Sequence, residues 1–87
     1  MIVSSVKNLA AAIKGERLKR GWTQAQLAEG AGTSRAWVVA VEKGKASAEV
    51  GAVLKTLAAL QLRVDISPST GPVHGEVDLD DILGEPR

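Results

Sequence analysis

The fold of this chain is decided by the stretch GWTQAQLAEGAGTSRAWVVAVEKG, residues 21–44. Thr23 and Gln26 have the spacing of a capping box, in which the Thr hydroxyl and the Gln amide each satisfy a backbone group at a helix start. Ser34 is placed to cap a further helix, and Gly32 before it is free to take a positive φ in a tight turn. Two short helices joined by a turn that contains glycine predict a helix-turn-helix unit.

Helical spacing of apolar residues continues on both sides of this stretch. Upstream, the pattern predicts a helix that starts after Ser4 or Ser5 and stops at Gly21. Downstream, a fourth helix is expected to start at Ser47 and to pack over the others. The residues expected to form the buried faces are Val6, Leu9, Ile13, Leu18, Leu27, Ala28, Ala31, Val38, Val41, Val50, Val53, Leu54, Leu57 and Leu60.

Length and composition exclude several classes of protein. The chain has 87 residues, no cysteine and a single histidine, His74. Such a length gives one small domain without a disulfide or a zinc–thiolate cluster, so oligomerisation is the remaining way to enlarge the core. With no acid/base or metal-ligand constellation, we expect no enzyme activity, no metal site and no cofactor.

A signal-sequence pattern and a long apolar run are both missing, so we expect a cytoplasmic protein.

The eleven basic and ten acidic side chains are divided unevenly along the chain. Residues 1–66 carry ten basic and five acidic side chains, whereas residues 67–87 carry Arg87 against five acidic ones. The turn formers of Ser67–Pro72 mark a linker at the same boundary. A basic body suits a polyanionic partner, and an acidic tail suggests a separate task.

The pattern within residues 21–44 resembles the Xre/Cro-type helix-turn-helix of bacterial and phage repressors. The matched positions are Gly21, Trp22, Thr23, Gln24, Leu27, Ala28, Gly32, Ser34, Val38, Val41, Glu42 and Gly44. The resemblance implies an all-α, lambda-repressor-like DNA-binding domain of four to five helices over residues 1–61. In this family the helix after the turn is the recognition helix, which lies in the major groove with its N-terminal residues at the base edges.

The resemblance also assigns candidate DNA contacts. Arg35, at the first exposed position of the recognition helix, is the best candidate for a two-pronged contact with guanine, and a phosphate contact is its alternative. Gln24 matches a family residue that binds a phosphate at a helix N-terminus. Trp37 either faces DNA or bends back onto the first helix. The other candidates are Thr23 and Ser34, which capping alone would explain, the apolar Ala36, Val39 and Ala40, and the loop residues Lys43 and Lys45.

The resemblance also assigns roles to residues outside the DNA surface. Arg17 and Glu42 match a family ion pair that joins the first helix to the end of the third, which is a structural role. Trp22 occupies a position that is usually apolar in the family, so we expect it in the core. Because the recognition helix is mostly apolar, direct base readout should be sparse and part of the specificity should come from DNA shape.

Residues 62–66 alternate strictly between apolar and polar side chains, which is typical of a strand. One strand cannot form a sheet, so we expect it to pair with the same strand of a second copy through Leu62, Val64 and Ile66. Four helices, a short dimerising strand and a flexible tail are similar to the HipB-type antitoxins, which repress their own operon and bind a HipA-type Ser/Thr kinase toxin. Such a dimer would place two recognition helices ~34 Å apart, which predicts an inverted repeat in the operator.

The acidic linker and tail, residues 67–87, contain a small apolar face. Leu79, Ile82 and Leu83 are spaced for one turn of a helix, as in a segment that orders on a protein partner. Docking on its own domain and a solvated chain end are the alternatives. The resemblance thus implies a repressor that is also the antitoxin of a HipBA-like module, with a stand-alone Xre-type regulator without a toxin as the other interpretation.

Overall fold

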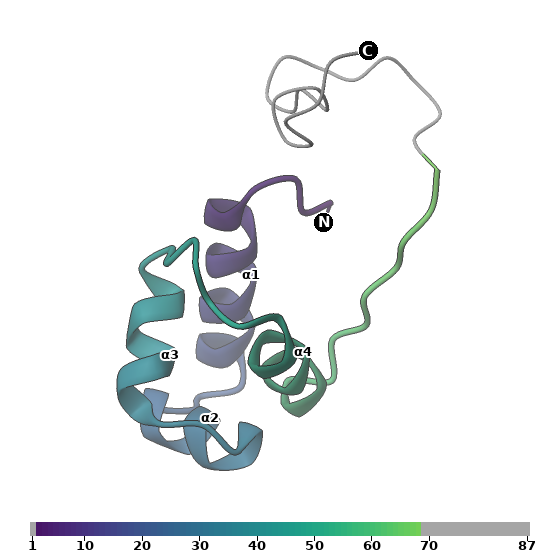
Figure 1. Ribbon diagram of the computed structural model, residues 1–87. Coiled ribbons are helices and arrows are strands. Elements are labelled where there is room, and N and C mark those ends of the chain that lie inside the picture. The colour runs from purple at the N-terminus through teal and green to yellow at the C-terminus, as the bar shows by residue number, and fades with distance from the viewer. Residues whose placement is uncertain (1, 69–87) are drawn as a thin grey trace.

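The computed structural model describes residues 2–68, which contain four α-helices and no strand (Figure 1). The helices are α1 (Val6–Lys19), α2 (Gln24–Ala31), α3 (Arg35–Glu42) and α4 (Val50–Ala59). In Figure 1, α1 and α3 stand next to each other, α2 crosses at their lower ends, and α4 is seen almost end-on on the other side of α1. The predicted all-α helix-turn-helix fold is confirmed.

The first three helices begin at the capping residues that the sequence predicts. The hydroxyl oxygens of Ser5 and Ser34 each accept a hydrogen bond of 3.0 Å from the backbone N–H three residues further on. The capping box at α2 is complete, because Thr23 Oγ1 accepts from the Gln26 N–H at 3.0 Å and Gln26 Oε1 accepts from the Thr23 N–H at 2.8 Å. These bonds satisfy amides that have no partner inside their own helix.

The predicted start of α4 at Ser47 is wrong. Residues 46–47 form a turn, Ala48 packs against the core, and the helix begins at Val50 after Glu49, which has an extended backbone. The Glu49 side chain makes no capping hydrogen bond. Ser47 is a residue type that often caps helices, but it lies two positions before Glu49, the residue at the N-cap of α4.

The core lies where α1, α2, α3 and α4 meet. Its buried side chains are Ile13, Leu27, Ala28, Val38, Val41, Leu57 and Leu60. Trp22 is half-buried and packs against this cluster, as do Leu9, Val53 and Leu62. Residues from all four helices thus share one core, which accounts for the stability of a chain without a disulfide.

Four residues expected in the buried faces are exposed instead. They are Val6, Leu18, Val50 and Leu54, which retain 40%, 57%, 69% and 49% of their accessible surface. The reason is geometric, because four short helices enclose a single core and no further helix among residues 2–68 covers the outer sides of α1 and α4. Apolar spacing alone does not distinguish the side that faces the core from a second apolar side.

The segment after α4 forms no strand in the single chain. Residues 62–68 have no regular secondary structure, and Figure 1 shows them leading away from α4. A strand needs a neighbour for its backbone hydrogen bonds, and no element among residues 2–68 pairs with this one. Strand pairing through residues 62–66 therefore stays a prediction. No helix among the described residues has the length and apolar character needed to cross a membrane.

Candidate nucleic-acid interface

The helix-turn-helix unit consists of α2, the turn at Gly32–Ser34, and α3. Gly32 has a φ of +71° and reverses the chain, and Ser34 then starts α3 with its capping bond. In both α2 and α3 the first backbone amides lack partners inside the helix, and the helix dipole adds partial positive charge there. Each helix start is thus suited to a phosphate oxygen.

The recognition helix presents a short, mostly apolar surface. Arg35 and Ala36 are exposed at its start, whereas Val39 and Ala40, further along, are half-buried. Trp37 is half-buried and packs against the core cluster, so only part of its ring is accessible from outside. Among these five residues, Arg35 alone carries a side chain that donates hydrogen bonds in the two-pronged geometry of a guanine contact.

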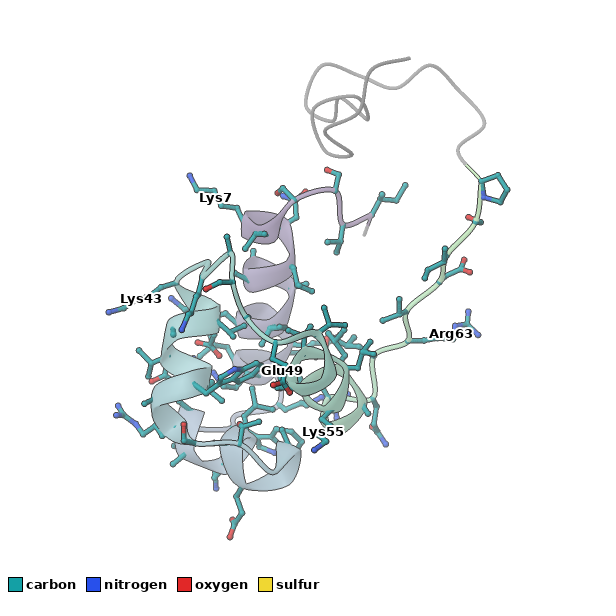
Figure 2. The ribbon with its side chains drawn as sticks, in the orientation of Figure 1. Lys7, Lys43, Glu49, Lys55 and Arg63 are labelled. Atoms are coloured by element: carbon teal, nitrogen blue, oxygen red, sulfur yellow. The ribbon has the colours of Figure 1, made fainter. Side chains whose placement is uncertain are left out.

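The lysines around α3 add positive charge beyond its end. Lys43 and Lys45 are both exposed, on either side of Gly44. Figure 2 shows Lys43 pointing outward on the same side of the molecule as Lys7 of α1, while Arg63 points outward on the opposite side. Lys7 is therefore a basic residue for this surface that the helix-turn-helix motif does not include, and its signal in the sequence is only its charge.

A buried ion pair joins α1 to the end of α3. Arg17 Nε donates to Glu42 Oε2 at 2.7 Å, and Arg17 Nη2 donates to Glu42 Oε1 at 3.0 Å. The side chains keep only 9% and 3% of their accessible surface. The third nitrogen, Arg17 Nη1, donates to the backbone carbonyl of Trp22 at 2.8 Å, just before α2. This arrangement is a polar clamp on the helix-turn-helix unit, formed by Arg17, Glu42 and the loop before α2.

The clamp includes a further residue that sequence reasoning assigned differently. Gln24, the expected phosphate ligand at the start of α2, donates from Nε2 to Glu42 Oε1 at 3.2 Å. One carboxylate oxygen thus accepts from Arg17 and from Gln24. Gln24 and Glu42 are eighteen positions apart, and no local pattern in the sequence predicts their contact. The Gln24 side chain connects the start of α2 to the end of α3 in the DNA-free chain.

Several expected residues fall outside the part of the chain that the structure describes. His74 and the tail residues Leu79, Ile82 and Leu83 are among residues 69–87, which are not described. Within residues 2–68, no group of three or more His, Cys, Asp or Glu side chains is arranged to hold a metal ion. The candidate surface thus consists of α2, α3 and the adjoining loops.

Comparison with known proteins places this geometry in a family. A family model described as a helix-turn-helix domain matches residues 8–66, which include all of α2, α3 and α4. The chain belongs to the helix-turn-helix domain family. No curated protein sequence matches it. The family match extends beyond the motif itself into the segment of residues 62–66, so this segment is part of the family's pattern.

Solved structures similar to this helix-turn-helix protein include several HipB structures. The chain of the HipB-O4 20mer complex is 27% identical, with a TM-score of 0.74, and the match covers 80% of this chain and 99% of that one. The HipA-HipB-O2-O3 complex contains a chain with the same values. The HipB-O1-O2 complex matches at 28% identity and a TM-score of 0.73, covering 78% and 99%. The resemblance to Xre-type, HipB-like proteins is confirmed.

Proposed function

We propose that this chain is a dimeric, sequence-specific DNA-binding repressor and the antitoxin of a HipBA-like module, in which it autoregulates its operon and binds a Ser/Thr kinase toxin. The observation that carries the proposal is the α2–α3 unit with exposed Arg35 at the start of α3. Support comes from HipB, which is 27% identical over 99% of its described chain and occurs in a complex with an O4 20mer and in one with HipA.

In the proposed complex, α3 lies in the major groove and Arg35 donates two hydrogen bonds to guanine O6 and N7. The capped start of α2 approaches a phosphate, where the free amides and the Gln24 side chain donate. Lys43 and Lys45 add phosphate contacts that do not depend on sequence. The apolar Ala36, Val39 and Ala40 offer contacts only to thymine methyl groups, so base readout depends on few residues.

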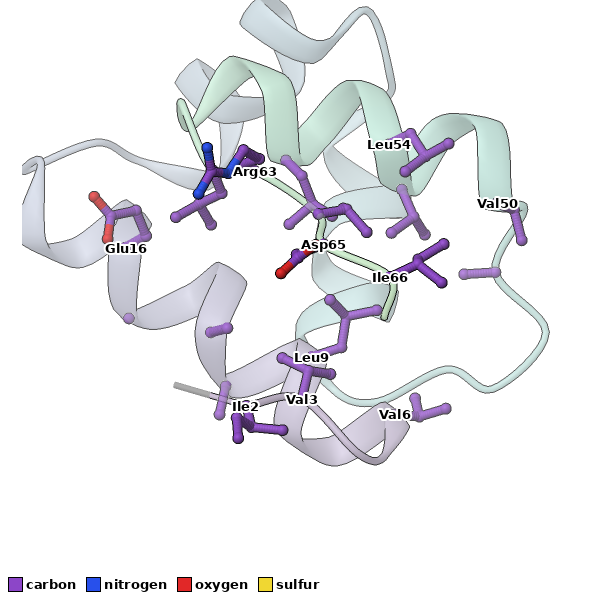
Figure 3. A pocket seen from close by; sticks show the side chains of 18 of the residues that line it. Ile2, Val3, Val6, Leu9, Glu16, Val50, Leu54, Arg63, Asp65 and Ile66 are labelled. Atoms are coloured by element: carbon purple, nitrogen blue, oxygen red, sulfur yellow. The ribbon is translucent and has the colours of Figure 1, made fainter. Parts of the chain in front are cut away.

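Support for the dimer comes from an apolar groove lined by residues of α1, α4 and the segment after α4. Figure 3 shows Leu54 of α4, Leu9 of α1 and Ile66 around one groove. Ile66 retains 91% of its accessible surface, and Val64 and Leu54 retain 50% and 49%. A second copy that adds its residues 62–66 here would cover these side chains and supply the missing strand neighbour.

The toxin partnership depends on the likeness to HipB and on the acidic tail. HipA accompanies HipB in one of the similar structures. In this chain we propose that Leu79, Ile82 and Leu83 form the apolar side of a segment that binds the kinase. The alternative is a stand-alone Xre-type regulator without a toxin, and the product of the neighbouring gene distinguishes the two.

Two measurements test the proposal. Fluorescence anisotropy with DNA from upstream of the chain's own gene should show tight binding to an inverted repeat and much weaker binding to random duplex at the same salt concentration. Pull-down with the neighbouring gene product should recover a kinase-like protein. Equal affinity for both DNAs would contradict the repressor, and recovery of no partner, with no kinase-like neighbour, would leave the stand-alone regulator.

A further inference from the structure

All four helices end in the same backbone arrangement. In each, the N–H of a residue with positive φ donates to the carbonyl three residues back, and the next N–H donates to the carbonyl five residues back. This pair of bonds is the Schellman motif, which satisfies carbonyls at the end of a helix. The residues with positive φ are Gly21, Gly32, Gly44 and Gln61, at +72°, +71°, +91° and +58°.

Gln61, at the end of α4, departs from this pattern. It is the sole non-glycine residue with positive φ among residues 2–68. In this left-handed conformation a Cβ atom crowds the neighbouring carbonyl oxygen, and glycine avoids that cost. The helix end itself therefore does not need a glutamine. A non-glycine residue in this disfavoured conformation indicates that the Gln61 side chain makes an interaction that glycine could not make.

The Gln61 side chain is tied to the end of α1. Arg20 Nη1 donates to Gln61 Oε1 at 3.2 Å across forty-one positions of sequence. Arg20 is itself held in place, since its Nε and Nη2 lie 3.2 and 3.1 Å from Glu16 Oε2 and its guanidinium carbon lies 5.5 Å from the centre of the Trp22 ring. A single exposed hydrogen bond contributes little, but a donor fixed by two neighbours loses little freedom in making it.

Gln61 is also the last residue before the segment expected to dimerise. Leu62 is half-buried against the core, and its N–H donates to the Leu57 carbonyl at 2.8 Å. After Leu62, the next four residues are exposed and have no regular structure. The backbone angles of Gln61 therefore set the direction in which residues 62–66 leave the helical body.

We propose that Gln61 is a positioning residue for dimerisation, which acts through Arg20 to aim residues 62–66 at the second copy. The inference rests on the proposed dimer and adds the residues that orient its strand. Without the Arg20 contact, the backbone at position 61 keeps only its two bonds at the end of α4 to hold a disfavoured conformation. Residues 62–66 then leave the helical body in a less fixed direction and must be ordered when the copies associate. Ordering at that moment lowers affinity, whereas a fixed direction avoids the loss.

The test uses the full chain with Gln61→Gly and, as a matched control, Gln61→Ala. Both remove the contact with Arg20, but only glycine relieves the cost of the left-handed conformation. Sedimentation should show a dimer dissociation constant raised by about tenfold in both variants. The monomer, studied by thermal unfolding at a concentration below that constant, should melt higher with glycine than with alanine. A residue with only a structural role would change the melting temperature and leave the dimer constant as it was.

Arg20→Ala completes the design as a double-mutant cycle with Gln61→Ala. If both side chains act through one bond, the double variant should dimerise no more weakly than the worse single variant. Additive losses, or an unchanged dimer constant in Gln61→Gly, overturn the inference. Deletion of residues 62–66 separates the two proposals. A dimer lost on deletion but unchanged in Gln61→Gly keeps the proposed dimer and rejects the role of Gln61, and a dimer that survives deletion rejects both.

Discussion

The side of the molecule that carries α2 and α3 differs from the side that carries α4 in whether its side chains find partners within the chain. On the first side, Arg17 and Gln24 both donate hydrogen bonds to Glu42, and the ion pair between Arg17 and Glu42 is buried. On the second side, Leu54 and Ile66 remain exposed along an apolar groove. The polar side chains of the first side thus have their partners within one chain, whereas the apolar side chains on the α4 side stay exposed, where we propose that a second copy binds. Changes to the clamp should affect folding, and changes to the groove should affect association.

Breaking the clamp should have the largest effect. Glu42→Ala leaves the Arg17 guanidinium buried without its carboxylate, so the free energy of unfolding should fall by about 3–5 kcal/mol. Urea denaturation measures this loss. Glu29→Ala, which removes an exposed carboxylate from α2, is the control and should change stability by less than about 0.5 kcal/mol. Similar values for the two variants would show that the clamp does not hold the first side together.

A charge in the groove should prevent association without unfolding the chain. Leu54 is half-exposed in the single chain, so Leu54→Asp costs the monomer little but places a carboxylate in the apolar dimer interface. Sedimentation should show a dimer dissociation constant raised by about a hundredfold. Lys55→Asp places a carboxylate at the neighbouring exposed position outside the groove and is the control. It also removes a positive charge, so it changes the net charge more than Leu54→Asp does. An intact Leu54→Asp dimer would place the interface elsewhere.

Loss of Arg35 should affect specificity on the first side. Arg35→Ala should weaken operator binding by about 1–3 kcal/mol and relax the preference at one base pair. Lys43→Ala should instead weaken all sequences alike and reduce the salt slope by about one. Anisotropy titrations with operator and random DNA at several salt concentrations separate these effects. An equal loss on both DNAs for Arg35→Ala would make it a phosphate contact.

The smallest effect is expected for Gln24, which joins the clamp at its edge. Gln24→Ala removes one hydrogen bond to Glu42, worth about 0.5–1.5 kcal/mol of stability. Operator affinity should fall, because the proposed phosphate contact of Gln24 is lost. The salt slope should stay unchanged, because the side chain is neutral. Denaturation and salt titration on the same preparation give both values. A changed salt slope would indicate that the lysines had moved as well.

Local features of the fold could be predicted from the sequence. Thr23 and Ser34 have side chains that cap a helix only when they stand at its N-cap position. Gly44 ends a helix because glycine takes the required positive φ without strain. Leu27 and Val38 are buried as their spacing predicts. These features depend on residues within one turn of each other, where spacing and residue type determine the geometry.

Features that depend on distant residues could not be predicted in this way. Val50 and Leu54 have the same helical spacing as buried residues, and only the arrangement of the other helices leaves them exposed. The bonds from Gln24 to Glu42 and from Arg20 to Gln61 are contacts across helices, between residues eighteen and forty-one positions apart. For the candidate site, the motif predicted the two helices and the exposed Arg35. It did not predict that Val39 and Ala40 are half-buried or that Gln24 binds Glu42.

We propose that two copies of this chain bind one inverted repeat through α3. Sedimentation of the full chain with the duplex from upstream of its own gene measures this directly, because the mass of the complex gives the number of chains per duplex. We expect two chains on the inverted repeat, and a large loss of affinity when one half of the repeat is replaced. A complex of one chain per duplex, with equal affinity for the intact and the half-replaced repeat, would contradict it.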